Sequence, residues 1–571
     1  MPLKLEEQLL KIRIAAEERE AEQKAAKTGV RYLHVATTPV KVEVLALIPE
    51  EEARKLKVAV FEFRKPDLAI AAYEPEHPAV VKLVEKFTSD GYRPKLFVVS
   101  MRGLEHLWSF YKFTISQKAP ITSRVNIERE RIMKLAAELA SIGNATEAID
   151  AFDERTGSVT EFLEVVLAGA LANRTSDVHF EPAEKAVKVR YRVDGILHDV
   201  SARVTPSLYR GVVSRIKLLS NLKINISDRP QDGRFTIGLA TKEVEIRVAI
   251  APSEFGEVIV MRVLDPDVIN LSLTDLGLRP DDLEIIKKEL ARPNGMILNT
   301  GPTGSGKTST LYAFLKAKAS SEIKIITVED PIEYHLSSIE QTQVDEEAGY
   351  TFANGLRSIM RQDPDAILVG EVRDRDTAEI AVQAALTGHL VFSTVHANEA
   401  AGAIPRLLDL GVKPGSISPA LNLVIGQRLV RRLCVACKVS RDVDADTAHA
   451  LKEFLDQLPE RVARENSVEI KLWSPKGCSV CGETGYKGRI AVFELLLTKE
   501  TSGVLSGNGG TLEEIVVGGG SVAAILAFAR KGGMVTMQED GVLKALAGVT
   551  TLEEVAEATG PIEYIGKRQR H

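Results

Sequence analysis

The sequence is poor in cysteine and contains no long hydrophobic stretch. Four cysteines among 571 residues argue against a fold held together by disulfides. Apolar runs such as 165–172 and 522–529 fall well short of the roughly 18 residues that a membrane-spanning helix needs. The first residues lack the charged segment followed by an apolar segment that forms a secretory signal. We therefore expect a cytoplasmic protein that does not cross a membrane by itself.

The sequence also lacks a strong excess of one charge. Lys plus Arg number 73 and Asp plus Glu number 79, which gives a net charge of −6, so the charge gives no reason to expect a nucleic-acid binder. Glycine (41) and proline (24) are close to average, which excludes collagenous and low-complexity classes. At about 150 residues per domain, the length predicts three to four domains.

The hydrophobic pattern divides the chain into several α/β segments. Residues 1–115 read as a small α/β domain, 116–155 as a linker with a charged helix, and 156–268 as a second α/β domain. The remaining segment, 269–571, carries most of the chemical motifs. Helices are expected near 79–88, 126–142, 160–173 and 207–223. Strands are expected near 58–63, 68–73, 96–100, 186–193 and 244–264.

Residues 301–308 match the phosphate-binding pattern G-x-x-x-x-G-K-[ST]. An apolar run of strand length, 295–300, precedes the motif, and a segment able to form a helix, 309–318, follows it. We expect Lys307 to bind the β- and γ-phosphates of ATP and the Thr308 hydroxyl to bind Mg²⁺. The expected phosphate-binding residues are Gly301, Pro302, Thr303, Gly304, Ser305, Gly306, Lys307, Thr308 and Ser309.

Two acidic segments follow strand-like runs and place carboxylates where a parallel sheet binds its ligand. The first, 324–333, contains Glu329 and Asp330, expected near the nucleotide, and Glu333, which we favour as the general base. The second, 365–371, resembles a Walker B strand, with Gly370 where most phosphate-loop enzymes have an Asp. Glu371 is expected to hold the water ligands of the metal, and the roles of the two glutamates are open to exchange.

Two histidines flank another apolar strand. His396 follows its carboxyl end and is expected to sense the γ-phosphate, whereas His389 precedes the strand and is equally well explained as structural.

Two C-x-x-C pairs are separated by 40 residues. Each pair is a tight turn that can give two thiolates to one tetrahedral Zn²⁺. Four thiolates leave no open coordination position, so the expected zinc is structural; buried or redox-active thiols are the alternative. The expected ligands are Cys434, Cys437, Cys478 and Cys481.

Arginine is the residue type that stabilises charge on a transferring phosphoryl group. None occurs between 301 and 326, so this charge must come from elsewhere, and surface ion pairs are the alternative role of each candidate. Positions 357 and 361 have the i, i+4 spacing of one helical face. The candidates are Arg190, Arg192, Arg234, Arg357 and Arg361.

Together these motifs resemble the secretion ATPase superfamily of type IV pilus assembly and type II secretion. The resemblance extends over about 158–560. It rests on 176–182, 192–195, 231–234, the phosphate loop, 329–333, 361–365, 369–371, 389–396 and the four cysteines. The glycine at 370 is this family's own pattern.

The resemblance implies a multidomain α/β protein with a RecA-like ATPase core after two smaller α/β domains, the second of them (156–268) PAS-like. It also implies a zinc insert near 428–490 and C-terminal helices near 500–560 that complete the motor. The implied assembly is a homohexamer with ATP between the second domain and the core. The zinc insert favours assembly and export ATPases over pilus-retraction ATPases.

The first domain, by the same resemblance, docks on an inner-membrane platform or partner and so attaches the protein peripherally to the membrane. No Arg-Leu-Gly motif occurs in 1–60, which makes control by cyclic di-GMP doubtful. The expected function is a mechanical ATPase that adds pilin subunits to a filament. The alternatives are a DNA translocase or helicase, since fold alone does not settle function, and a non-hydrolysing nucleotide sensor. The sequence leaves pilus assembly, type II secretion and DNA uptake undecided.

Overall fold

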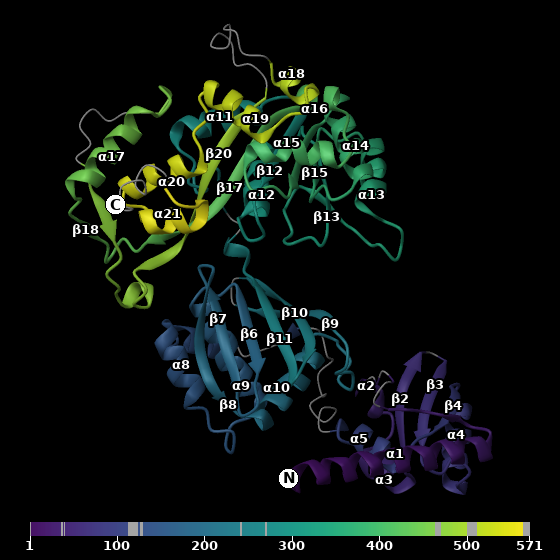
Figure 1. Cartoon of the computed structure of the whole chain (residues 1–571). Helices are drawn as coiled ribbons and strands as arrows, with labels where there is room; N and C mark the ends of the chain where they lie inside the picture. Colours follow the sequence, from purple (N-terminus) through teal and green to yellow (C-terminus); the bar gives the residue numbers. More distant parts are fainter. Residues whose placement is uncertain are drawn as a thin grey trace. The chain divides into compact units, whose positions relative to one another are not determined.

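The computed structural model describes residues 2–35, 38, 40, 42–64, 66–111, 124–125, 129–239, 242–268, 271–462, 470–498 and 511–562. The chain forms two compact units, Met1–Val263 and Leu264–His571, and each is described by itself (Figure 1). Within the described residues, the helices are all too short or too polar to cross a membrane.

The N-terminal part of the first unit is a four-stranded sheet with helices packed on it. The sheet order is β1 (Arg31–Tyr32), β4 (Arg93–Val98), β3 (Asp67–Ala72) and β2 (Val58–Arg64). The helices are α1 (Pro2–Thr28), α2 (Val42–Leu45), α3 (Glu50–Leu56), α4 (Pro78–Ser89) and α5 (Met101–Trp108). Glu18 of α1 accepts hydrogen bonds from Tyr32 and, at 2.7 Å, from Ser100, which fastens the long helix to the sheet.

The second part of this unit is a seven-stranded sheet. Its order is β5 (Arg124–Val125), β9 (Gln231–Gly238), β10 (Glu243–Ser253), β11 (Gly256–Leu264), β6 (Asp177–Pro182), β7 (Val187–Val193) and β8 (Ile196–Val204). The helices are α7 (Arg129–Glu138), α8 (Ile142–Asp150), α9 (Val159–Ala172) and α10 (Pro206–Leu219).

Alternation of apolar and polar residues gives this sheet two different faces. On β7, Val187, Val189 and Tyr191 are buried against the helices, while Arg190 and Arg192 lie on the opposite face, as expected for strands with period two. Helix α8 lies in the segment expected to be a linker, yet its residues Ala145 and Ile149 belong to the same core.

The second unit is built on another seven-stranded sheet. Its order is β14 (Glu340–Gln343), β13 (Ile325–Glu329), β15 (Ala366–Val369), β16 (Leu390–Val395), β12 (Gly295–Thr300), β17 (Leu421–Leu433) and β20 (Tyr486–Leu497). All neighbouring strands are parallel except β17 and β20. The helices are α11 (Pro280–Leu290), α12 (Lys307–Lys318), α13 (Phe352–Ile359), α14 (Arg375–Leu386), α15 (Ala400–Asp409) and α16 (Pro414–Ala420).

The central strands of this sheet are buried along their whole length. Every residue of β12, β13, β15 and β16 is buried, and separate apolar cores lie against the sheet. Continuous burial is the pattern of a parallel sheet covered on both faces. It agrees with the α/β fold class expected from the sequence.

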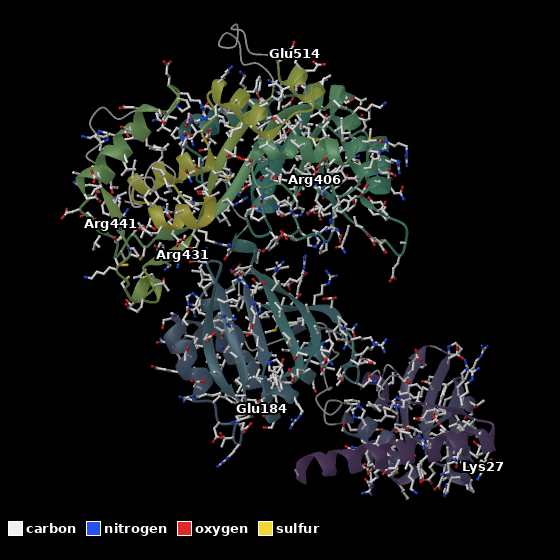
Figure 2. All side chains as sticks on the ribbon, viewed as in Figure 1. Lys27, Glu184, Arg406, Arg431, Arg441 and Glu514 are labelled. Carbon is white, nitrogen blue, oxygen red and sulfur yellow. The ribbon has the colours of Figure 1, made fainter. Side chains whose placement is uncertain are left out.

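The cysteine-bearing segment lies between β17 and β20 and contacts the C-terminal helices. It contains β18 (Val439–Arg441), α17 (Ala445–Asp456) and β19 (Leu472–Ser474), and the C-terminal helices are α18 (Leu512–Val517), α19 (Val522–Lys531), α20 (Met537–Leu546) and α21 (Leu552–Thr559). Arg431 and Arg441, both labelled in Figure 2, form ion pairs with Glu554 and Glu553 of α21. These pairs join β17 and the cysteine-bearing segment to helix α21.

Candidate nucleotide site and tetracysteine cluster

The predicted nucleotide-binding residues come together because parallel strands end at one edge of a sheet. The phosphate loop follows β12, Asp330 follows β13, Glu371 lies just beyond β15, and His396 follows β16. Ligands of open α/β sheets bind at this carboxyl edge. The topology thus gathers four motifs that lie up to 95 positions apart (from 301 to 396) in the sequence.

The phosphate loop is a backbone cradle that only glycine permits at two positions. Gly301 has φ +151°, and a Cβ there would lie 2.4 Å from the Gln427 carbonyl oxygen. Gly306 has φ +87° and would place a Cβ 2.9 Å from the Gln427 side-chain nitrogen. The Ser305 hydroxyl is buried and has no hydrogen-bond partner among the described residues. A buried hydroxyl that lacks a hydrogen-bond partner, in a glycine-rich loop at the start of α12, is suited to binding a phosphate.

Lys307 lies across this loop. Its ammonium donates to the carbonyl oxygens of Gly301 at 2.8 Å and Pro302 at 3.0 Å. Burial, helped by the positive charge of Arg428, holds the pKa of Lys307 below its ordinary value, although Glu371 and Glu333 act in the opposite direction. Neutral carbonyls thus hold a partly desolvated cation, which can move onto a phosphate without breaking an ion pair with a carboxylate.

Glu371 is engaged on both of its carboxylate oxygens. One oxygen pairs with Arg373, and the other lies 3.2 Å from His396 Nε2. Arg373 also pairs with Asp330 at 3.4 Å. Glu371, His396 and Asp330 therefore lie close together: Glu371 contacts His396, and Arg373, which the sequence interpretation did not select, links Glu371 to Asp330.

The two remaining acids of the first acidic segment have different surroundings. Glu333 is half-buried, and its negative charge is close enough to Lys307 to act toward a higher pKa of the lysine. Glu329 is buried and accepts hydrogen bonds from Tyr312, from Thr327 at 2.6 Å and from Gln341 at 3.1 Å. The carboxylate of Glu329 is thus engaged inside the fold, where it anchors the strand beneath the site.

Arg428 is a second residue that the sequence interpretation missed. It lies in β17, and its Nη1 would be 3.3 Å from a Cβ at Gly301, which places the guanidinium beside the phosphate loop. It donates to the Asn398 carbonyl at 2.8 Å and the Gln427 carbonyl at 3.3 Å. Burial lowers its pKa, and Glu494 partly offsets this effect. Only a paired neighbouring strand brings this arginine to the loop, so no local motif marks it.

The arginines predicted in the first unit lie on one face of its seven-stranded sheet, and carboxylates surround them. Arg190 pairs with Asp199 at 2.8 Å and with Glu181 at 3.4 Å. Arg192 pairs with Asp177 at 3.5 Å, and Arg234 with Glu245 at 3.7 Å.

The predicted arginines of the second unit lie next to the Walker B-like strand. Arg357 is in α13 and contacts Asn354 at 3.1 Å and Asp376 at 3.8 Å. Arg361 lies in the short 3-10 helix Met360–Gln362, so the expected single helical face is interrupted after Ile359. His389, just before β16, contacts the Ala384 carbonyl at 3.1 Å, which fits a structural role.

The four cysteines form one cluster. Their sulfur atoms lie within 4.8 Å of one another, with Sγ–Sγ distances of 3.9, 3.8 and 3.7 Å between three pairs. A tetrahedron with Zn–S bonds of about 2.3 Å has edges of about 3.8 Å. Burial raises the pKa of Cys481, but backbone N–H groups of Cys478 and Gly485 that point at its sulfur bring it down to about 7. The donor set and spacing therefore fit a zinc ion.

Comparisons with known proteins agree with these motifs. The chain matches the family described as Type II/IV secretion system protein over residues 153–557. It is 35% identical over 539 residues to the type IV pilus assembly ATPase PilB of Myxococcus xanthus, a match covering 94% of this chain and 90% of that protein. It is 41% identical over 432 residues to the type II secretion system protein E of Klebsiella pneumoniae, covering 74% and 82% respectively. The X-ray structure of the Legionella pneumophila ATPase DotB aligns with 71% of this chain and 97% of its own, at 21% identity and a TM-score of 0.49.

Proposed function

The chain belongs to the type II/IV secretion system protein family and is an ATPase, and we propose that it works as a hexameric motor for type IV pilus assembly. The observation that carries the proposal is the phosphate loop with Lys307 held on neutral carbonyls beside Glu371 and His396. The similarity to a pilus assembly ATPase, which includes the N-terminal segment as well as the core, favours pilus assembly over secretion.

In the proposed reaction, Lys307 leaves its carbonyl partners and binds the β- and γ-phosphates of ATP. The Thr308 hydroxyl would hold Mg²⁺, which supplies charge neutralisation to the phosphates when bound. Glu333 takes a proton from the attacking water, and Glu371 orients water near the γ-phosphate. His396 contacts the Glu371 carboxylate. Loss of the γ-phosphate would therefore alter the contacts of the segment that follows β16.

The proposed ring explains how the arginines of the first unit contribute. Arg190 and Arg192 lie on the polar face of a sheet, and arginines presented across a domain or subunit boundary commonly stabilise phosphoryl transfer. The carboxylates that pair with them, Asp199 and Asp177, lie directly opposite on the neighbouring strands β8 and β6. The ring would work at the cytoplasmic face of the inner membrane, against a platform protein of the pilus machine.

We assign the tetracysteine cluster to structural zinc. Four thiolate ligands close the coordination sphere, so the metal would contribute folding energy and no Lewis-acid chemistry. The cluster joins two turns that lie more than 40 residues apart in the sequence and so closes the segment between β17 and β20.

Two experiments test the proposed function. Purified protein should hydrolyse ATP at a rate that single-stranded DNA leaves unchanged, whereas strong stimulation by DNA would favour the translocase alternative. In the source organism, deletion of the gene should abolish surface pili, and the wild-type gene but not its Lys307→Ala form should restore them. Normal piliation with lost export of secreted proteins would instead assign the motor to type II secretion.

A further inference from the structure

Glu494 of β20 is a buried carboxylate that caps two helices at once. One oxygen accepts the backbone N–H of Ala400 at 2.6 Å, and the other accepts the backbone N–H of Met537 at 3.2 Å. These are the first residues of α15 and α20. First-turn N–H groups have no partner inside their own helix, and a carboxylate there is also favoured by the helix dipole.

The position of Glu494 in the sheet connects it to the nucleotide site. Val395, Thr300, Gly426 and Glu494 are paired across β16, β12, β17 and β20 in one row. Thr300 is the last residue before the phosphate loop, and Val395 is the last before His396. Gly426 makes the side-chain position possible, because a Cβ there would lie 2.6 Å from a Glu494 carboxylate oxygen.

The segment between β16 and α15, residues 396–399, is held by the same part of the fold. The Ala397 backbone N–H donates to the Thr300 hydroxyl at 2.9 Å, and Arg428 donates to the Asn398 carbonyl at 2.8 Å. Glu399 provides no side-chain cap for α15. Glu494 therefore replaces a local cap and fixes the point where this segment enters the helix.

The two helices that share Glu494 belong to different apolar cores. Ala400 lies in the core that contains the Walker B-like strand, whereas Met537 and Val542 of α20 lie in two smaller clusters toward the C-terminal end of the chain. Burial raises the pKa of Glu494, an effect that its two N–H donors and Arg428 only partly offset. Burying this charge costs free energy, and the two N–H bonds compensate part of that cost.

We propose that Glu494 is a positioning residue that couples the state of the nucleotide site to helix α20. When the γ-phosphate is lost, the segment that carries His396 changes its contacts, and the N-terminus of α15 moves with it. Because one carboxylate binds the first N–H group of both helices, α20 must follow, or its Met537 N–H loses this partner. This inference rests on the proposed ATP-driven function and adds the route by which hydrolysis reaches the C-terminal helices.

Hydrogen exchange on the full-length protein, with Mg-ADP and with a non-hydrolysable ATP analogue, tests the coupling. In the wild type, exchange at 537–540 should differ between the two nucleotides by about 5-fold or more, the lower range of allosteric coupling. Glu494→Gln keeps the side-chain size but can accept only one of the two hydrogen bonds. It should remove the difference at α20, lower kcat more than 5-fold and leave KM within 2-fold.

Two further variants separate coupling from stability. Gly426→Ala displaces Glu494 from the opposite strand and should reproduce the loss of coupling. Glu539→Gln is the matched control, because this buried carboxylate of α20 bonds Arg530 and the Thr536 N–H instead of α15. It should speed exchange of α20 equally with both nucleotides and keep the nucleotide-dependent ratio.

The phosphate-loop peptides show which idea fails. If nucleotide does not slow hydrogen exchange of these peptides in the wild type, the proposed function is wrong. Suppose instead that nucleotide slows hydrogen exchange of the phosphate loop in the wild type. The coupling is then wrong if exchange of α20 does not depend on the nucleotide in the wild type, or still depends on it in Glu494→Gln. Neither result contradicts the proposed function.

Discussion

The phosphate loop and the arginine-bearing sheet of the first unit both present positive charge, but different groups hold that charge. Lys307 and Arg428 donate to neutral backbone carbonyls, whereas Arg190 and Arg192 pair with carboxylates. A phosphate that reaches the loop displaces only carbonyl oxygens. A phosphate that reaches the sheet must compete with formal negative charges.

This difference indicates that the loop and the sheet arginines have different roles in nucleotide binding. We expect the loop to bind a nucleotide by itself, because its cations gain charge neutralisation on binding. The sheet arginines form partly exposed ion pairs with carboxylates of neighbouring strands, and we expect them to exchange partners once a phosphate comes within reach. Such arginines suit a contact that forms and breaks during a cycle, and the following predictions test this contrast.

The largest effect is expected at the loop itself. Lys307→Ala should reduce ATP turnover by about 10³-fold or more, because it removes the charge aimed at the transferring phosphate. The fold should survive, and circular dichroism melting should be nearly unchanged. Lys287→Ala, which removes an exposed lysine paired with Glu284, is the control. Wild-type phosphate release by Lys307→Ala would overturn the phosphate-loop assignment.

A comparable loss of activity is expected when an arginine proposed to stabilise the transferring phosphoryl group is removed from the sheet. Arg190→Ala or Arg192→Ala should lower kcat by up to about 10³-fold. Lys188→Ala is the matched control, since Lys188 lies on the same strand and pairs with the same Asp199 at 3.1 Å. Activity should rise with protein concentration, and mixing an arginine variant with Lys307→Ala chains should restore part of the turnover. A fully active monomer would refute the ring.

Replacing the acids should have an intermediate effect. Glu333→Gln and Glu371→Gln should each allow ATP binding but slow hydrolysis by about 10²-fold, since both act mainly in the transition state. Single-turnover measurements with ATP check this. If Glu333→Gln hydrolyses ATP normally and Glu371→Gln is inactive, Glu371 is the general base and the two assigned roles must be exchanged.

Removing Arg428 should weaken binding more than chemistry. Arg428→Ala should raise the KM for ATP by about 10-fold, the effect of losing one hydrogen bond to a charged group. Arg428→Lys should recover part of the loss. An unchanged KM, measured at fixed Mg²⁺, would show that this arginine serves the fold alone.

The smallest effect on nucleotide binding is expected at the cysteines. Purified protein should contain a single zinc ion per chain, and Cys434→Ser should lower the melting temperature while changing ATP affinity by less than about 2-fold, because a closed zinc site contributes to folding. Ser479→Ala, in one of the same turns, is the control. Metal analysis without zinc, on protein purified under reducing conditions, would contradict the assignment.

Much of this organisation can be read from local patterns. Local patterns predict a strand near 186–193, and the motif at 301–308 predicts a strand, loop and helix; the structure confirms both. The expected strand over 244–264 is instead two strands, β10 and β11, because Gly256 with φ +136° allows the turn between them. The buried apolar positions are even-numbered before the turn (244, 246, 248 and 250) and odd-numbered after it (259, 261 and 263).

The sequence by itself determined the groups that lie close along the chain: the phosphate loop, the two cysteine turns, and the acids and histidine that end successive strands. These depend on local backbone geometry, which nearby residues specify. Only the tertiary structure decided that Arg428 lies beside Gly301, that Glu329 is engaged inside the fold, and that Glu494 caps both α15 and α20. Those placements depend on strand order and register across the sheet, which form through contacts between residues far apart in the chain.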